Sequence, residues 1–174
     1  MLNGELPVIA TALLLIFPVA MAFAAANDLF TMRIPNAISI ALVAAFCISV
    51  FAVGLSWQDA LTHVGVGAAA LAFGFVLFSF NLLGGGDAKL LAAGALWMGL
   101  GQVFPFMVYV TIFGGVLSLA ILFYRRYIPA TNWQLPEWAQ KLHVNGTGIP
   151  YGIAIAAAAL KLYPATIWFK TFAA

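Results

Sequence analysis

Charged residues are scarce in this sequence. Of its 174 residues, seven are Lys or Arg and five are Asp or Glu, so that 7% of the chain is charged and 65% is hydrophobic. An ordinary soluble domain carries about 25% charged residues, and the composition therefore excludes that class. The net charge of +2 is too small, and the basic residues are too scattered, to indicate a nucleic-acid-binding protein.

Cysteine is almost absent as well. The single Cys47 excludes a disulfide framework and a zinc site built from cysteines, and we interpret it as a small packing residue. His63 and His143 fall on opposite sides of the membrane in the topology described below, so they are not expected to share a metal ion. We therefore predict neither a metal nor a cofactor.

Long apolar segments are what the sequence does contain. A helix of about 20 apolar residues crosses a bilayer, and several such segments predict an all-α polytopic membrane protein. We expect a single membrane-embedded domain over residues 1–174. Its predicted spans number about six: Leu6–Ala26, Asn36–Leu55, Leu61–Leu82, Ala88–Gly101, Phe104–Tyr124 and Ile149–Phe169.

Two parts of this topology have an alternative. The first segment resembles a signal peptide at Ala24-Ala25-Ala26, but it lacks a positive n-region and its apolar stretch is long, so we expect a retained helix. Gly101-Gln102 and Pro105 separate the fourth and fifth spans and predict a tight reversal. A single kinked helix is the alternative, and it would leave five spans with the chain ends on opposite sides.

The distribution of basic residues orients the spans. The connections 27–35, 83–89 and 125–148 share one side of the membrane, and the other side receives Lys170. By the positive-inside rule, the side with more basic residues is cytoplasmic. The basic residues on that side are Arg33, Lys89, Arg125, Arg126 and Lys141.

The connection from Tyr127 to Val144 is of mixed polarity. Pro136 is suited to open a short helix, and a helix in the headgroup region, anchored by Trp133 and Trp138, is the simpler interpretation. A docking surface for a substrate is the alternative. Three apolar residues share one face of this predicted helix: Leu135, Trp138 and Leu142.

Two aspartates lie where an apolar run meets a polar break. Asp28 ends the first span, within Asn27-Asp28-Leu29-Phe30-Thr31-Met32-Arg33-Ile34-Pro35-Asn36, and Asp87 opens the fourth, within Gly84-Gly85-Gly86-Asp87-Ala88-Lys89. A carboxylate at membrane depth is costly and indicates a functional site. If helix packing brings the two together on the cytoplasmic side, they share one proton and titrate as a unit. One can then activate a water molecule while the other polarises a carbonyl group, which is sufficient for peptide hydrolysis.

The glycines before Asp87 have two interpretations. Gly84, Gly85 and Gly86 form either a loose connection between helices or a turn that approaches a ligand closely. Joined to an aspartate at membrane depth, they favour a functional turn that places Asp87 beside an extended substrate.

Polar residues near the aspartates also have a structural and a functional interpretation. Lys89 and Arg33 are expected to anchor the chain at the cytoplasmic interface, and either could also hold an ionised aspartate or the substrate. Pro35 suits the first turn of the second span. Asn36 is expected to cap that helix or to bond to the Asp28 turn.

Taken in order, these segments resemble the type IV prepilin peptidases, the bacterial branch of the GxGD intramembrane aspartyl proteases. The resemblance rests on Asp28 with Arg33-Ile34-Pro35-Asn36, and on Gly84-Gly85-Gly86-Asp87-Ala88-Lys89. A third segment, Gly148-Ile149-Pro150-Tyr151-Gly152, is similar to the Pro-aromatic-Gly turn that opens the last helix of that family. The resemblance implies that Asp28 and Asp87 are the catalytic pair. It also implies supporting roles for the glycines, for Lys89, and for Pro150, Tyr151 and Gly152.

The resemblance further implies a substrate and a location. Members of the family remove a short basic leader from pilin-like precursors at the cytoplasmic face of the inner membrane, after a glycine and before the apolar pilin helix. The implied partners are a prepilin-like protein, the lipid bilayer and the pilus assembly machinery. Larger members carry a domain with paired CxxC motifs and also N-methylate the new terminus. This chain has one cysteine and is similar to the short form associated with tight-adherence (Flp) pili, so we expect peptidase activity alone.

Two other functions stay open on sequence alone. A small proton- or ion-coupled transporter would use two carboxylates as a relay, and it favours acidic groups near mid-membrane on discontinuous helices. A non-catalytic subunit of a pilus or secretion machine would tolerate replacement of either aspartate by asparagine.

Overall fold

The computed structural model of the chain describes residues 6–128, 135–143 and 148–172. Within these ranges every regular element is helical, and α1 to α4 are long and apolar enough to cross a membrane. The prediction of an all-α polytopic membrane protein is confirmed. The elements are α1 (Leu6–Thr31), α2 (Asn36–Val53), α3 (Trp57–Ser79), α4 (Gly85–Tyr127), α5 (Glu137–His143), α6 (Tyr151–Leu162), the 3₁₀ helix η1 (Tyr163–Ala165) and α7 (Ile167–Phe172).

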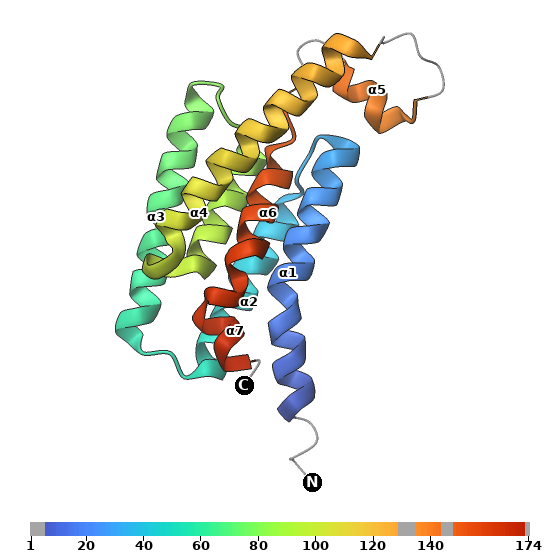
Figure 1. Cartoon of the computed structure of the whole chain (residues 1–174). Coiled ribbons are helices and arrows are strands. Elements are labelled where there is room, and N and C mark those ends of the chain that lie inside the picture. Colours follow the sequence, from blue (N-terminus) through green and yellow to red (C-terminus); the bar gives the residue numbers. More distant parts are fainter. Residues whose placement is uncertain (1–5, 129–134, 144–147, 173–174) are drawn as a thin grey trace.

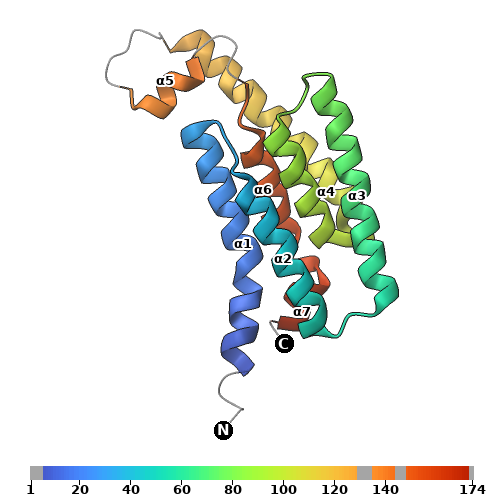
Figure 2. The ribbon, with the colours of Figure 1, turned by 180° about the vertical axis from the view of Figure 1, so that it is seen from behind.

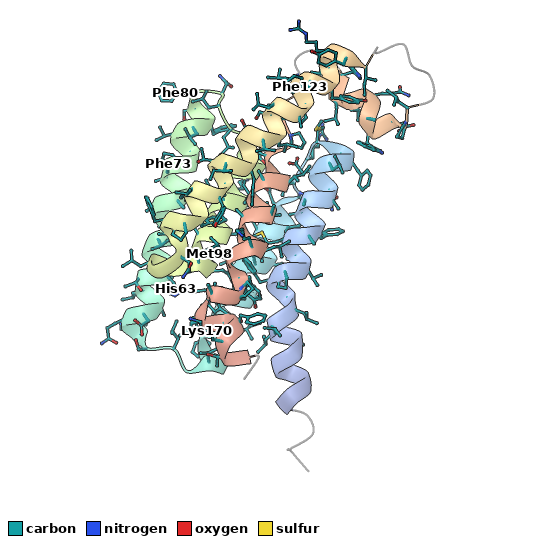
Figure 3. The ribbon with its side chains drawn as sticks, viewed as in Figure 1. His63, Phe73, Phe80, Met98, Phe123 and Lys170 are labelled. Carbon is teal, nitrogen blue, oxygen red and sulfur yellow. The ribbon has the colours of Figure 1, made fainter. Side chains whose placement is uncertain are left out.

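Large apolar side chains cover the outer faces of the long helices. Ile40 in α2, Phe75 in α3 and Phe104 in α4 are 67%, 63% and 77% exposed. Figure 3 shows Phe73 and Phe80 pointing outward along α3. A soluble monomer rarely exposes so much contiguous apolar surface, whereas lipid hydrocarbon accepts it.

The helix α4 consists of two arms that run in opposite directions. Gly99 interrupts it with φ 61° and ψ −175°, a backbone region that is essentially restricted to glycine. A Cβ added at Gly94 would lie 2.8 Å from Cζ of Phe106, whereas twelve residues of a straight helix span about 18 Å. The arms are antiparallel in Figure 1, which favours the predicted reversal over a single kinked span. The turning residue is Gly99, and Pro105 lies inside the second arm.

Side chains from two other helices bind the last carbonyl groups of the first arm. His63 Nδ1 lies 2.7 Å from the Leu96 oxygen, and Trp168 Nε1 donates to the Trp97 oxygen at 2.7 Å. Because a carbonyl only accepts hydrogen bonds, Nδ1 is the protonated ring nitrogen. Carbonyl groups at an interrupted helix lack their intrahelical donors, and leaving them unpaired in a bilayer is costly. These two bonds therefore stabilise the reversal, beside which Figure 3 labels His63.

The buried core lies where α1, α4 and α6 meet. α6 packs against both α1 and α4. The predicted last span, Ile149–Phe169, is divided into α6, η1 and α7, since Pro164 cannot continue the α6 hydrogen-bond ladder. The largest fully buried side chains are Trp97, Trp168, Phe17, Phe106 and Met21.

One end of the bundle gathers the connections that matter for function. The α1–α2 connection, the α3–α4 connection and the start of α6 lie at the upper end of Figure 1, and the start of α1 lies at the lower end with α7. α5 follows Pro136, as predicted, and packs on the end of α4, where Tyr124 Oη donates to the Ala139 oxygen at 3.0 Å. The Trp138 ring meets Phe30 of α1 edge-on at 6.3 Å. The predicted anchor Trp133 lies outside the described residues.

Candidate active site

Asp28 lies near the C-terminal end of α1, as predicted, although the helix extends beyond the predicted Leu6–Ala26. The helix continues to Thr31, and the polar side chains of its last turns bond to carbonyls of the same helix. Asn27 Nδ2 donates to the Phe23 oxygen at 3.0 Å, and Thr31 Oγ1 donates to the Asn27 oxygen at 2.8 Å. A rigid helical segment therefore carries Asp28, whose side chain is buried.

Asp87 lies in the first turn of α4. Gly84 is the N-cap, and Gly85, Gly86 and Asp87 are the first three helical residues. The three glycines therefore begin a helix and do not form a loose connection, and Gly84 has an ordinary φ of −70°. The Asp87 carboxylate reaches back to the backbone of Gly84, as an acidic residue at the third helical position often does, and it also complements the positive end of the helix dipole.

The glycines of this segment permit close packing. A Cβ added at Gly84 would lie 2.6 Å from Oδ2 of Asp87, and one at Gly86 would lie 3.2 Å from Cβ of Ile34. Ile34 also lies against Gly152, where an added Cβ would be 2.7 Å from Cδ1 of Ile34. Sequence reasoning gave Ile34 no role. No local signal marks it, since the same connection also contains the apolar Met32.

Gly152, in the first turn of α6, faces both carboxylates. Its N–H donates to Oδ2 of Asp28 at 2.7 Å, and the same amide faces the carboxylate of Asp87. Pro150 is the buried N-cap of α6, so the Gly152 amide is one of the first-turn donors that have no partner within their own helix. The helix start places partial positive charge between two acidic groups, which stabilises the approach of one to the other.

Asp28 and Asp87, together the aspartate pair, lie within electrostatic range of each other. They are 4% and 9% exposed. Within the part of the chain that the structure describes, Oδ1 of Asp87 has no hydrogen-bond partner. A buried carboxylate oxygen of this kind, beside a second carboxylate, is available to hold a proton or to bind water.

Lys89 and Asn36 join two helices next to the aspartate pair. Lys89 Nζ donates to Oδ1 of Asn36 at 2.8 Å and so connects the first arm of α4 to the start of α2. Asn36 was expected to cap α2 or to bond to the Asp28 turn; it is the first residue of α2, and its Oδ1 accepts from Lys89. Pro35 is the N-cap of α2, and Arg33 is exposed in the connection before it.

The Tyr151 side chain points away from the aspartate pair. An added Cβ at Gly114, in the second arm of α4, would lie 2.9 Å from the Tyr151 ring, and the Tyr151 hydroxyl is 3.3 Å from Oγ of Ser118. Tyr151 thus fixes α6 against the second arm of α4, and the backbone of the next residue serves the site. Sequence reasoning missed Ser118, which carries no local motif.

Among the described residues, no group of three or more His, Cys, Asp or Glu side chains is placed to hold a metal ion. His63 binds the backbone near the reversal of α4, and the His143 ring lies 4.4 Å from that of Tyr124 at the other end of the bundle. The two histidines therefore lie far apart in the fold.

The fold and the site define an all-helical membrane protein with a buried pair of aspartates at one end of its bundle. A model of the type IV leader peptidase family matches residues 15–119, more than half of the chain. The chain belongs to this family, which makes it a protease. The matched range contains both aspartates and ends before Gly152, which the fold brings to them. No curated protein and no solved structure matches the chain.

Proposed function

We propose that the protein is an aspartic endopeptidase that removes the short basic leader from type IV prepilin-like precursors of the Flp type. The observation that carries the proposal is the burial of Asp28 and Asp87 together, with the Gly152 amide facing both. Membership of the leader peptidase family supports the substrate class. The catalytic assignment rests on the chemistry that two adjacent carboxylates can perform.

The aspartate pair holds one proton, because two adjacent buried carboxylates cannot both stay ionised at low cost. The ionised carboxylate takes a proton from water, and the water oxygen attacks the scissile carbonyl carbon. The protonated carboxyl group gives its proton to the carbonyl oxygen, which yields a tetrahedral diol. When the C–N bond breaks, one carboxyl group protonates the leaving amine and the other takes the diol proton. The pair then again holds one proton, and no covalent intermediate is needed.

The basic residues support a cytoplasmic site in the bacterial inner membrane. Arg33 and Lys89 lie at the end of the bundle that carries the aspartate pair, and Arg125 and Arg126 end α4 beside α5. Cytoplasmic segments of membrane proteins are enriched in such residues. A precursor with a basic leader and an apolar helix would present its scissile bond at this boundary.

The position of the carboxylates argues against the transporter alternative. α4 is discontinuous, as transporter helices often are, but Asp87 lies at its start and not at the break. Near the break, the Leu96 and Trp97 carbonyl groups are bound by His63 and Trp168 and not left open to an ion. The remaining alternative, an assembly subunit, is separated from a peptidase by experiment.

A membrane cleavage assay tests the proposal. A pilin-like precursor is combined with the wild-type protein, with Asp28→Asn or with Asp87→Asn. Each substitution keeps the side-chain volume and removes the acid–base group, so leader removal should fall by about 10²–10⁴-fold or more. Asp59→Asn is the matched control, because Asp59 lies exposed in the first turn of α3, at the far end of the bundle. Processing at the wild-type rate by either of the first two variants, with unchanged thermal unfolding, would exclude the aspartate pair.

A further inference from the structure

Two apolar grooves flank the first arm of α4. The α2–α3 groove has a volume of about 710 Å³, and its lining on α2 runs from Asn36 to Cys47. The α3–α4 groove, between α3 and the second arm of α4, has a volume of about 830 Å³ and includes Tyr151 in its lining. Both volumes lie in the range of about 300–1,000 Å³ that is usual for binding pockets. Volume therefore does not distinguish them.

The α2–α3 groove is open because its two walls do not pack on each other. α2 and α3 each contact α4, and Figure 2 shows the first arm of α4 lying between them. Ile40 and Val43 on α2, and Leu71 on α3, line the groove and are exposed. A segment lying in the bilayer can therefore reach the groove from the side.

The polarity of the α2–α3 groove changes along its length. Lys89 and Asn36 form its polar end, and Lys89 follows Asp87 by two residues in the same helix. From this polar end toward Cys47 the lining is mostly apolar. From Asn36 to Cys47 the groove follows about 17 Å of helix, roughly three turns. This is about half of the ~30 Å hydrocarbon core of a bilayer.

Small residues on the groove walls suit a helical occupant. Ala44 on α2, Ala68 on α3 and Ala92 on the first arm of α4 all line it, and small residues allow the backbones of membrane helices to approach closely.

We propose that the α2–α3 groove binds the first three turns of the substrate's apolar helix, which enters from the bilayer and leaves its leader at the aspartate pair. This inference rests on the proposed function and adds where the substrate lies. A polar leader followed by an apolar helix has the same order of polarity as the groove. Tyr151 lines the α3–α4 groove, but its side chain packs on the second arm of α4 and not against the aspartate pair.

Two neighbouring alanines of α3 provide a matched test. Ala68 lines the α2–α3 groove and Ala69 lines the α3–α4 groove, and both are exposed. A photo-crosslinking amino acid such as p-benzoylphenylalanine is placed at each position in an Asp87→Asn background, which binds the precursor without cutting it. The expected result is a crosslink to the precursor helix from position 68 and little from position 69. The reverse pattern, or no crosslink from either position, would overturn the inference.

The same positions allow a kinetic test in the active enzyme. Ala68→Leu fills part of the α2–α3 groove and should lower kcat/KM for the full-length precursor by about tenfold or more, mainly through KM, which corresponds to ~1.4 kcal/mol of lost binding. Ala69→Leu should change kcat/KM by no more than about twofold, which corresponds to less than ~0.5 kcal/mol, because Ala69 lines the other groove. Thermal unfolding of both variants shows whether the fold is kept. Equal kinetics of the two variants would overturn the docking inference alone, whereas failure of the wild-type enzyme to process the precursor would overturn the proposed function.

Discussion

The backbone amide of Gly152 donates a hydrogen bond of 2.7 Å to Oδ2 of Asp28, a residue 124 positions earlier in the chain. The bond fixes one carboxylate of the aspartate pair against the start of α6, and the same amide faces Asp87. No side chain fits at position 152, because an added Cβ would lie 2.7 Å from both Oδ2 of Asp28 and Cδ1 of Ile34. The geometry of the aspartate pair therefore depends on a residue outside the range that matches the family.

Gly152→Ala should impair catalysis more than folding. The added methyl group displaces Asp28 or turns the amide away from it, and a misplacement of about 1 Å at a catalytic group can cost about 10²-fold in rate. Gly148→Ala is the control, since Gly148 is exposed and a Cβ there would meet no atom within 4 Å. The measurement is kcat for precursor cleavage, together with thermal unfolding in detergent. Equal rates for the two variants would show that the amide does not position Asp28.

The three glycines before Asp87 should differ in their tolerance of alanine. A Cβ at Gly84 would meet the Asp87 carboxylate at 2.6 Å and one at Gly86 would meet Ile34 at 3.2 Å, whereas one at Gly85 would lie 3.4 Å from the edge of the Phe78 ring, an ordinary contact. We expect Gly84→Ala and Gly86→Ala to lower the cleavage rate by about tenfold or more, the effect of ~1.4 kcal/mol in the barrier.

The matched control for the glycine series is Gly85→Ala, which should retain most of the wild-type rate. Replacing Ile34 by the smaller valine should restore neither Gly86→Ala nor Gly84→Ala, because a Cβ at Gly86 meets the Cβ and backbone atoms of Ile34, which valine also has, and a Cβ at Gly84 meets Asp87. A uniform loss across all three alanine variants would instead indicate that the segment needs the flexibility of glycine.

The membrane class and the shared end of the two aspartates could be predicted from the sequence. Both depend on sums over many residues, namely the hydropathy of long segments and the placement of basic residues, and such sums tolerate local errors. The C-terminal end of α1 and the N-terminal end of α4, which carry the two aspartates, were predicted less well. The polar residues that begin at Asn27 predicted the end of the first span at Ala26. In the structure, the side chains of Asn27 and Thr31 bond to carbonyl groups of α1, and the helix continues through them.

The contacts that shape the site could not be predicted because they depend on packing between distant segments. Ile34 lies against both Gly86 and Gly152, and neither neighbour is close to it in sequence. The glycines before Asp87 were predicted to allow a close approach, but the sequence did not show that Ile34 is the residue that approaches Gly86. An unusual backbone conformation occurs at Gly99, where no motif marks it.

Trp168→Phe should destabilise the protein without a direct effect on the chemistry. Phenylalanine keeps an aromatic ring in the core but loses the N–H that donates to the Trp97 oxygen at 2.7 Å. An unpaired buried acceptor costs about 1–3 kcal/mol, so the apparent Tm should fall clearly. Trp57→Phe is the control, because Trp57 is 72% exposed and its loss should leave Tm nearly unchanged. An equal Tm for the two variants would show that the bond contributes little to the reversal of α4.

Gly99→Ala should be the most destabilising of the glycine-to-alanine changes in α4. Alanine is strained by about 1–3 kcal/mol at φ 61° and ψ −175°, and its Cβ would also collide with the His63 ring. Gly101→Ala, two residues later, is the control, because a Cβ there would meet no atom within 4 Å, and we expect its Tm to equal or exceed that of the wild type. Adding His63→Ala to Gly99→Ala removes the collision, but it leaves the backbone strain and also loses the bond between His63 and the Leu96 oxygen. The double variant should therefore not regain wild-type stability, and full recovery would mean that the reversal is set by packing against His63 and not by the backbone of Gly99.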